Sequence, residues 1–456
     1  MTNIIACPCS FLLANETGEE LAGGEAEIKL DNENLMILPK FGEAMHISLM
    51  DIIEILPAEY RVNMIRSSRE KLGVFDLGYK FEDFVSNLFQ ARNEMILRYL
   101  LMNESIKKSG VWGDLTLVDA SGAEIRFEKC EVRIYETSIA LIPSLGEPIR
   151  VHYSNISQVD AKDYSIAIAT ESGARFTMSR MGREFDSTSR DLSEAMNALN
   201  IQSQSMLKDL APAADPSVIR AVSRLMRDGK AARSSDLKSI SSTMWGDLEK
   251  KMEQTPIWSE YQYLKSVARQ EKIAMGIKRG LMGDLTGNYL WFLIPIYGTN
   301  TGYGNAIALE AVRLPSADPR QDDSTTGVLA EDTPTNAGGN ATYFFRIVGR
   351  EDYAEIAANM EELDALVDSM IQIANQLMLD TNFRREPIFL PDEKLRTDPK
   401  YARYRYAAQK LSSLKQLRQL FIGRIIHSSF EQWKSDVSGL LSFNMTASND
   451  ARWEKS

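Results

Sequence analysis

Residues 34–43 read Asn-Leu-Met-Ile-Leu-Pro-Lys-Phe-Gly-Glu, and residues 138–147 read Ser-Ile-Ala-Leu-Ile-Pro-Ser-Leu-Gly-Glu. In both stretches an apolar run ends at a proline, and a Gly-Glu pair follows after two more residues. Extended without gaps from Phe11 to Leu88 at a shift of 104, the comparison gives 13 identities in 78 positions. Ordinary composition would give about five. The chain therefore begins with a duplicated module.

The identities fall where turns are expected. The matched pairs include Gly18 with Gly122, Pro39 with Pro143, Gly42-Glu43 with Gly146-Glu147, Ile52 with Ile156, Tyr60 with Tyr164, Gly78 with Gly182 and Phe81 with Phe185. Between these positions apolar residues alternate with polar ones, which is typical of half-buried strands. After Gly78 the period becomes helical and places Phe84, Leu88 and Leu97 on one stripe. Each copy is predicted to be a set of short strands followed by one helix.

An amphipathic helix can close the open end of a bent antiparallel sheet by burying its remaining apolar surface. In this pattern residues 1–207 resemble the pleckstrin-homology-like superfold, including its GRAM-type variants. The resemblance is carried by residues 27–39, 45–52 and the helix after Phe81, and by residues 131–143, 149–156 and the helix after Phe185. It implies binding, to phosphoinositides in some members and to proteins in many others, rather than catalysis.

Lipid-binding members of that superfold use basic residues around the first hairpin. Copy one instead carries Glu16, Glu19, Glu20, Glu25 and Glu27 there, which argues against phosphate binding. Copy two carries Arg126, Lys129 and Arg133. These three residues form the alternative, lipid-headgroup site, and a solvated strand face is the competing interpretation.

Composition bounds the class of protein. A chain of 456 residues is expected to form two to four domains. The net charge of −11 disfavours unselective binding to nucleic acid or anionic lipid. The three cysteines, Cys7, Cys9 and Cys130, are too few and too unevenly spaced for a disulfide framework, so we expect a cytoplasmic protein.

The predicted fold class is α+β, with two pleckstrin-homology-like barrels each closed by a helix and a mainly helical remainder. The predicted domains are module 1 (1–104), module 2 (105–207), a helical domain (217–285), a third β module with a long helix (286–380) and a helical C-terminal segment (381–456). Residues 315–340 are rich in Pro, Gly, Ser, Thr, Asp and Asn, which predicts a loop. The periodicity of residues 353–379 predicts one long helix.

Three short helices are expected at 217–226, 235–240 and 243–252, an arrangement that invites a helix-turn-helix interpretation. The third helix carries Asp247, Glu249, Lys250 and Lys251, a mixed set rather than the basic and polar set of a recognition helix. We therefore favour a packing bundle and keep nucleic-acid association through residues 217–252 as a second alternative.

The strongest charge asymmetry lies between Lys394 and Arg424, with nine basic residues against the single acid Asp398. Tyrosines interleave with the arginines, and an apolar stripe predicts a basic amphipathic helix. The candidate binding residues are Arg403, Tyr404, Arg405, Lys410, Lys415 and Arg418. Such a helix could bind a protein, an anionic membrane or nucleic acid. Alternatively it packs inside the protein and faces module 1, because residues 1–108 carry 17 acids against 11 bases.

The sequence offers no recognisable catalytic motif. The three histidines are isolated, and Cys7-Pro8-Cys9 lacks the spacing of zinc knuckles. The glycine-rich run 298–304 favours a hairpin loop over a dinucleotide site. We therefore expect no cofactor, no metal and no catalytic residues. The predicted function is that of a non-enzymatic scaffold or adaptor that binds protein partners, with peripheral binding to anionic lipid through module 2 or residues 394–424 as the alternative.

Overall fold

The computed structural model describes residues 5–100, 104–280, 287–298, 304–314, 341–446 and 452–454. The predicted loop 315–340 and most of the glycine-rich run lie outside the described residues. The chain divides into two compact units. Unit 1 comprises residues 1–196 and 391–410, and unit 2 comprises residues 197–390 and 411–456.

Module 1 is a seven-stranded antiparallel sheet followed by a helix. Its elements are β1 (Ile5–Ala14), β2 (Glu20–Leu30), β3 (Asn34–Pro39), β4 (Met45–Ser48), β5 (Ile52–Ala58), β6 (Arg61–Arg66), β7 (Lys71–Phe75) and α1 (Phe81–Tyr99). The strand order is β4-β3-β2-β1-β7-β6-β5. Apolar residues from the strands and from α1, including Ile28, Val62, Phe84 and Leu88, share one core. The helix therefore buries the apolar face that the sheet leaves open.

Module 2 repeats this arrangement. Its elements are β8 (Lys108–Val118), β9 (Glu124–Ile134), β10 (Ser138–Pro143), β11 (Ile149–His152), β12 (Ile156–Lys162), β13 (Ser165–Thr170), β14 (Arg175–Ser179) and α2 (Phe185–Leu210). The strand order is β11-β10-β9-β8-β14-β13-β12. This is the same topology as in module 1, because each strand of module 2 takes the place of the module 1 strand numbered seven lower. The α+β fold class and the pair of sheets, each followed by a helix, are confirmed.

The two copies also match in local conformation. Tyr60 and Tyr164 both have positive φ, 59° and 55°, at equivalent turns. Tyr60 lies 5.4 Å from the ring of Phe81, and Tyr164 lies 5.7 Å from the ring of Phe185, both with an interplanar angle of 56°. In each copy the turn after the fifth strand is thus fixed against the first residue of the closing helix.

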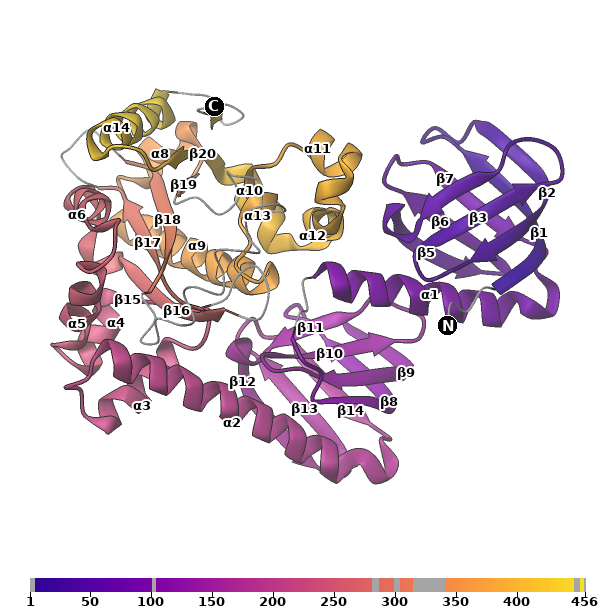
Figure 1. Ribbon diagram of the computed structural model, residues 1–456, viewed down its shortest axis with the longest axis horizontal. Coiled ribbons are helices and arrows are strands. Elements are labelled where there is room, and N and C mark those ends of the chain that lie inside the picture. Colours follow the sequence, from indigo (N-terminus) through magenta and orange to yellow (C-terminus); the bar gives the residue numbers. More distant parts are fainter. Residues whose placement is uncertain are drawn as a thin grey trace, which may run out of the picture. The chain divides into compact units, whose positions relative to one another are not determined.

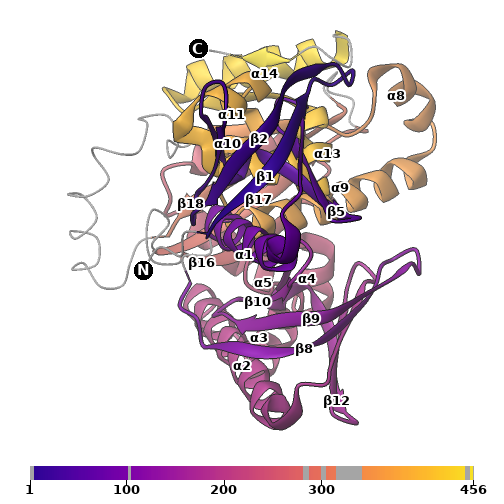
Figure 2. The same ribbon diagram turned by 90° about the vertical axis from the view of Figure 1, so that its right-hand side faces the viewer.

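Helix α1 contacts both N-terminal sheets, and Figures 1 and 2 show it between them. Leu97 does not join the core of module 1 as its place on the predicted stripe suggested. It is buried with Tyr135, Ala140 and Ile142 of module 2. A helix that is apolar on two faces can serve two sheets, and this explains why its periodicity looked like one broad stripe.

Unit 2 contains a third seven-stranded sheet. Its strands are β15 (Ala231–Arg233), β16 (Ala274–Gly280), β17 (Gly287–Ile296), β18 (Ala306–Arg313), β19 (Ala341–Arg346), β20 (Phe421–Ile426) and β21 (Trp453–Glu454). They lie in sequence order, unlike those of the modules, and only β20 and β21 pair in parallel. The third sheet therefore does not repeat the topology of the first two.

The helices of unit 2 are α3 (Pro216–Leu225), α4 (Ser234–Ile240), α5 (Met244–Met252), α6 (Trp258–Val267), α8 (Arg350–Ile356), α9 (Met360–Asp380), α10 (Glu386–Phe389), α13 (Ser412–Leu420) and α14 (Phe430–Thr446). One buried cluster joins helices α3 to α6 and α14 to the sheet. The sequence analysis separated 217–285, 286–380 and 381–456 into three domains, whereas their side chains share this core. Strand β16 lies inside the stretch predicted to be helical, and β20 lies inside the predicted C-terminal helices.

Two long predicted helices are interrupted. The helix predicted at 353–379 is divided into α8 and α9, because Asn359 leaves the helical region and its side chain caps α9. The basic helix predicted at 394–424 is broken at Pro399, which lacks a backbone N–H, and at Leu411, which is extended. The helical spacing of apolar residues continues on both sides of each break. The sequence pattern therefore did not reveal the interruptions.

The close packing in unit 2 predicts the effect of adding one methyl group. A Cβ on Gly276 in β16 would meet the Trp291 indole and the Lys230 carbonyl oxygen, the latter at 2.7 Å. Gly276→Ala should therefore lower the free energy of unfolding by about 1–3 kcal/mol. Gly246→Ala in α5, where a Cβ meets no atom within 4 Å, should raise it by up to about 1 kcal/mol. Urea unfolding of both variants measures the difference, and equal midpoints would contradict the packing described.

Candidate functional site

The segment 391–410 holds most of the predicted binding residues and belongs to unit 1, although the chain on both sides of it belongs to unit 2. It consists of α11 (Asp392–Thr397), a 3₁₀ helix at Pro399–Tyr404 and α12 (Arg405–Lys410). Asp398 caps the 3₁₀ helix by accepting from the Lys400 N–H. The segment is thus a compact run of short helical turns rather than an extended arm.

The segment contacts carboxylates of both modules. Arg405 Nη1 donates to Asp51 Oδ1 at 2.9 Å. Tyr406 Oη donates to Glu147 Oε2 at 3.2 Å, and Lys410 Nζ lies 3.1 Å from Glu147 Oε1. The arrangement agrees with the interpretation in which the basic segment faces acidic residues of its own protein.

Glu147 also accepts from Arg92 of α1, at 3.1 Å. Arg92 is 2% exposed and donates to the carbonyl oxygens of Ile52 and Ile53 as well. Glu147 therefore receives three donors, which lie on α1 and on α12. A carboxylate has lone pairs for about four hydrogen bonds, so Glu147 can accept from all three donors. We call the surface formed by Asp51, Arg92 and Glu147 the junction site.

Burial raises the pKa of Tyr406, and the nearby charge of Glu147 raises it further. The phenol therefore keeps its proton and donates it to Glu147 at neutral pH. Its ring packs against the core of module 1. Tyr406 thus packs its ring against apolar side chains and donates a hydrogen bond from its hydroxyl to the charged carboxylate of Glu147.

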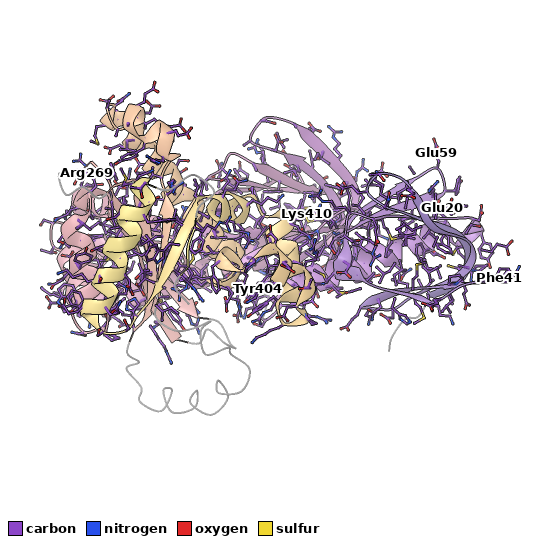
Figure 3. All side chains as sticks on the ribbon, turned by 90° about the horizontal axis from the view of Figure 1, so that it is seen from above. Glu20, Phe41, Glu59, Arg269, Tyr404 and Lys410 are labelled. Carbon is purple, nitrogen blue, oxygen red and sulfur yellow. The ribbon has the colours of Figure 1, made fainter. Side chains whose placement is uncertain are left out.

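The other predicted residues of the basic stretch lie elsewhere. The Arg403 guanidinium lies 5.0 Å from the ring centroid of the buried Tyr404. Arg418 of α13 is buried in unit 2 and donates to the Leu390 carbonyl oxygen at 2.8 Å, whereas Lys415 is exposed. Figure 3 labels Tyr404 and Lys410. The six residues therefore do not form one continuous basic face.

The alternative lipid-headgroup residues are also occupied. Arg133 lies between Glu94 and Glu131, and its side chain is 14% exposed. Arg126 pairs with Glu124, and the Lys129 ammonium lies 5.1 Å from the Trp112 ring centroid. A headgroup phosphate would have to compete with these partners.

The three helices of the nucleic-acid alternative are used for packing. In α5 the side chains of Met244, Trp245, Leu248 and Met252 are buried in the core of unit 2. The acids of this helix are paired: Asp247 with Lys250, and Glu249 with Lys265. The bundle interpretation accounts for α3 to α5.

A buried polar cluster in unit 2 was not visible in the sequence. His427 Nε2 lies 3.0 Å from Glu310 Oε2, and His427 Nδ1 lies 3.6 Å from Glu260 Oε1. Thr342 Oγ1 donates to Glu310 Oε2 at 2.6 Å. The four side chains come from α6, β18, β19 and the end of β20, and the side chain of Glu310 is 1% exposed. The cluster is largely buried, with side-chain exposures of 11% for His427 and 9% for Glu260.

The junction site had one sequence signal and the histidine cluster had none. Glu147 is one of the repeat identities, with Glu43 as its counterpart. Arg92 has no basic counterpart, since Met196 occupies its position in the second copy. Thr342 and His427, which both bond to Glu310, lie 32 and 117 residues after it in the chain. No local sequence pattern therefore joins them.

The cysteines lie on strands and are free and buried. Burial raises the pKa of Cys9 and of Cys130, each to about 12, so both stay as thiols. Within the ranges that the structure describes, no group of three or more His, Cys, Asp or Glu side chains could hold a metal ion. The expectation of no cofactor stays a prediction.

None of the helices in the described ranges combines the length and apolarity needed to cross a membrane. No protein family model matches the chain, and no curated protein matches it. Among solved structures, the Spt16D–Pob3N heterodimer is similar at 12% identity and a TM-score of 0.17, over 37% of this chain and 84% of that chain.

The histidine cluster predicts a pH-dependent contribution to stability. Burial opposes protonation of His427, but the hydrogen bonds and charges of Glu310 and Glu260 outweigh it and raise the pKa. A raised pKa stabilises the fold below the unfolded value of about 6.5, and this stabilisation is lost as pH rises through the folded value. The stability difference between the wild type and Glu310→Gln should therefore be larger near pH 6 than near pH 9. Urea unfolding followed by tryptophan fluorescence measures it; a constant difference would contradict the assignment.

Proposed function

We propose that this protein is a protein-interaction scaffold whose N-terminal tandem modules are pleckstrin-homology-like, with their junction site as a peptide-docking surface. The observation that carries the proposal is the docking of residues 391–410 onto Asp51 and Glu147. This segment lies about two hundred residues beyond module 2 in the chain. A surface that binds so distant a segment has the features needed to bind a similar segment of another protein.

The chemistry of the junction site defines what it would bind. Two carboxylates at the surface of two modules favour a short basic helix, and a tyrosine between the basic residues adds apolar burial. Arg405, Tyr406 and Lys410 supply these features from within the chain. The natural ligand is accordingly a basic, tyrosine-containing helical segment, with residues 391–410 as the internal example.

Peripheral lipid binding has less support than protein binding. Arg405, Lys410 and Arg133 are already paired with carboxylates. Exchanging these partners for lipid phosphates would cost the existing contacts, although exposed pairs are individually weak. A cytoplasmic location remains part of the proposal, supported by three cysteines without a disulfide.

Reversing Glu147 should release the segment. In Glu147→Lys the carboxylate that accepts from Tyr406 and Lys410 is replaced by a cation, so backbone amides of 391–410 should exchange with solvent at least about tenfold faster. Glu43→Lys, at the equivalent repeat position, is the matched control and should leave that exchange unchanged. Hydrogen–deuterium exchange with mass spectrometry measures both, and equal protection in the two variants would contradict docking at Glu147.

The docking function itself is tested by supplying the segment as a separate peptide. A fluorescent peptide of residues 391–410 should bind the full chain carrying Arg405→Glu and Lys410→Glu, in which the internal copy is weakened, at least about tenfold more tightly than it binds the wild type. Anisotropy titration measures this. Absence of binding to both chains would refute the proposal. Sedimentation of the wild type with anionic vesicles, lost on reversing Arg403, Arg405 and Lys410, would favour the lipid alternative.

A further inference from the structure

The contact between α1 and module 2 defines a helix-docking face. Leu97 of α1 packs on Ala140 and Ile142, which project from the outer side of β10. Asn93 Nδ2 donates to the Gly146 carbonyl oxygen at 2.8 Å, in the loop after that strand. The face thus receives an apolar side chain on the strand and an amide donor at the loop.

Charged residues frame the same contact. Arg92 of α1 pairs with Glu147. Glu94 lies one residue beyond Asn93 and pairs with Arg133 of β9, with Arg133 Nη1 3.0 Å from Glu94 Oε2. The helix therefore presents a base, an amide and an acid in succession, and a leucine three residues later.

Module 1 has the same face in the same register. Met36 of β3 lies between Lys29 and His46, as Ala140 of β10 lies between Arg133 and Arg150. Leu38 lies opposite Glu27, as Ile142 lies opposite Glu131. The loop beyond repeats as Gly42-Glu43 and Gly146-Glu147. The paired strand positions and the Gly-Glu sequence that receive α1 in module 2 therefore have counterparts in module 1, whereas Tyr135, which also packs with Leu97, is replaced by Asp31.

This counterpart face is partly exposed to solvent among the residues that the structure describes. Ala140 and Ile142 are 0% and 7% exposed under α1, whereas Met36 and Leu38 are only partly buried. Gly42, Glu43 and His46 are exposed. Phe41, beside Gly42, is 89% exposed and is labelled in Figure 3 at the outer end of module 1. Apolar residues framed by charges and left uncovered are typical of an interaction surface.

We propose that the outer face of β3, formed by Lys29, Met36, Leu38, Gly42 and Glu43, is a docking site for an amphipathic helix of another protein. The helix carries a base facing Glu43, an amide donor for the Gly42 carbonyl oxygen, an acid facing Lys29, and a leucine on Met36 and Leu38. This is the pattern of Arg92-Asn93-Glu94 with Leu97. The inference extends the proposed scaffold function to a second surface, separate from the junction site.

A second copy of this chain fits the face less well. At the positions of the docking residues, α2 carries Met196, Asn197, Ala198 and Ile201. The amide and the apolar residue are kept, and Ile201 is 67% exposed. Both charges are absent, so Glu43 would lose water without gaining a partner, and Lys29 would keep only its existing pair with Glu27 at 3.2 Å. Charge complementarity therefore selects a different protein as the occupant.

The probe is a fluorescent peptide of residues 81–100, which carries the docking pattern, titrated into the full chain and followed by anisotropy. Leu38→Glu and Glu43→Arg should each weaken binding at least about tenfold. Leu56→Glu, on the opposite edge strand β5, should change it less than about twofold. A peptide with Arg92→Glu and Glu94→Arg should bind the wild type weakly and recover affinity for the Glu43→Arg chain.

Other results would overturn this site. These are absence of binding, equal binding of the native and charge-reversed peptides, or a loss caused by Glu147→Arg but not by Glu43→Arg, which indicates exchange into module 2. A chain dimer dissolved by Ile201→Glu in sedimentation equilibrium would assign the face to a second copy. Asp51→Lys separates the two proposals, because it disturbs the junction site and should leave binding of this peptide unchanged.

Discussion

The buried guanidinium of Arg92 is the interaction on which unit 1 depends. A cation that is 2% exposed must be compensated by nearby acceptors, because an unpaired charge in a protein interior is costly. Arg92 finds them in two carbonyl oxygens of module 1 and in Glu147 of module 2. Glu147 in turn receives Tyr406 and Lys410. One charged residue thus connects the closing helix of the first module, the second module and the distant segment 391–410.

The two modules share a frame but differ in how their outer faces are covered. Both keep the sheet order, the turn at Tyr60 or Tyr164 and its contact with the closing helix. They differ in what covers the outer face of the third strand of each sheet. The outer face of β10 is covered by α1 and is used inside the protein, whereas the outer face of β3 stays open.

Unit 2 is organised by its third sheet. The strands follow one another along the chain, and helices that read as a separate bundle supply part of the same core. The chain leaves this unit at Leu390 and returns at Leu411. Between these points it contributes the segment that occupies the junction site. Basic residues that looked like one exposed face are therefore divided between the two units, and most of them already have partners.

The sequence by itself determined the duplication, the strand-then-helix order of each module and the three short helices α3 to α5, because alternation, turn residues and amphipathic stripes are local properties. Glu147 stood out in the sequence only as a repeat identity with Glu43 and was not predicted to be a site residue. Only the tertiary structure decided that β16 and β20 are strands, that Arg405 meets Asp51 and that His427 meets Glu310. Each of these depends on a partner far away in the chain, and neither periodicity nor composition specifies which distant residues a fold brings together.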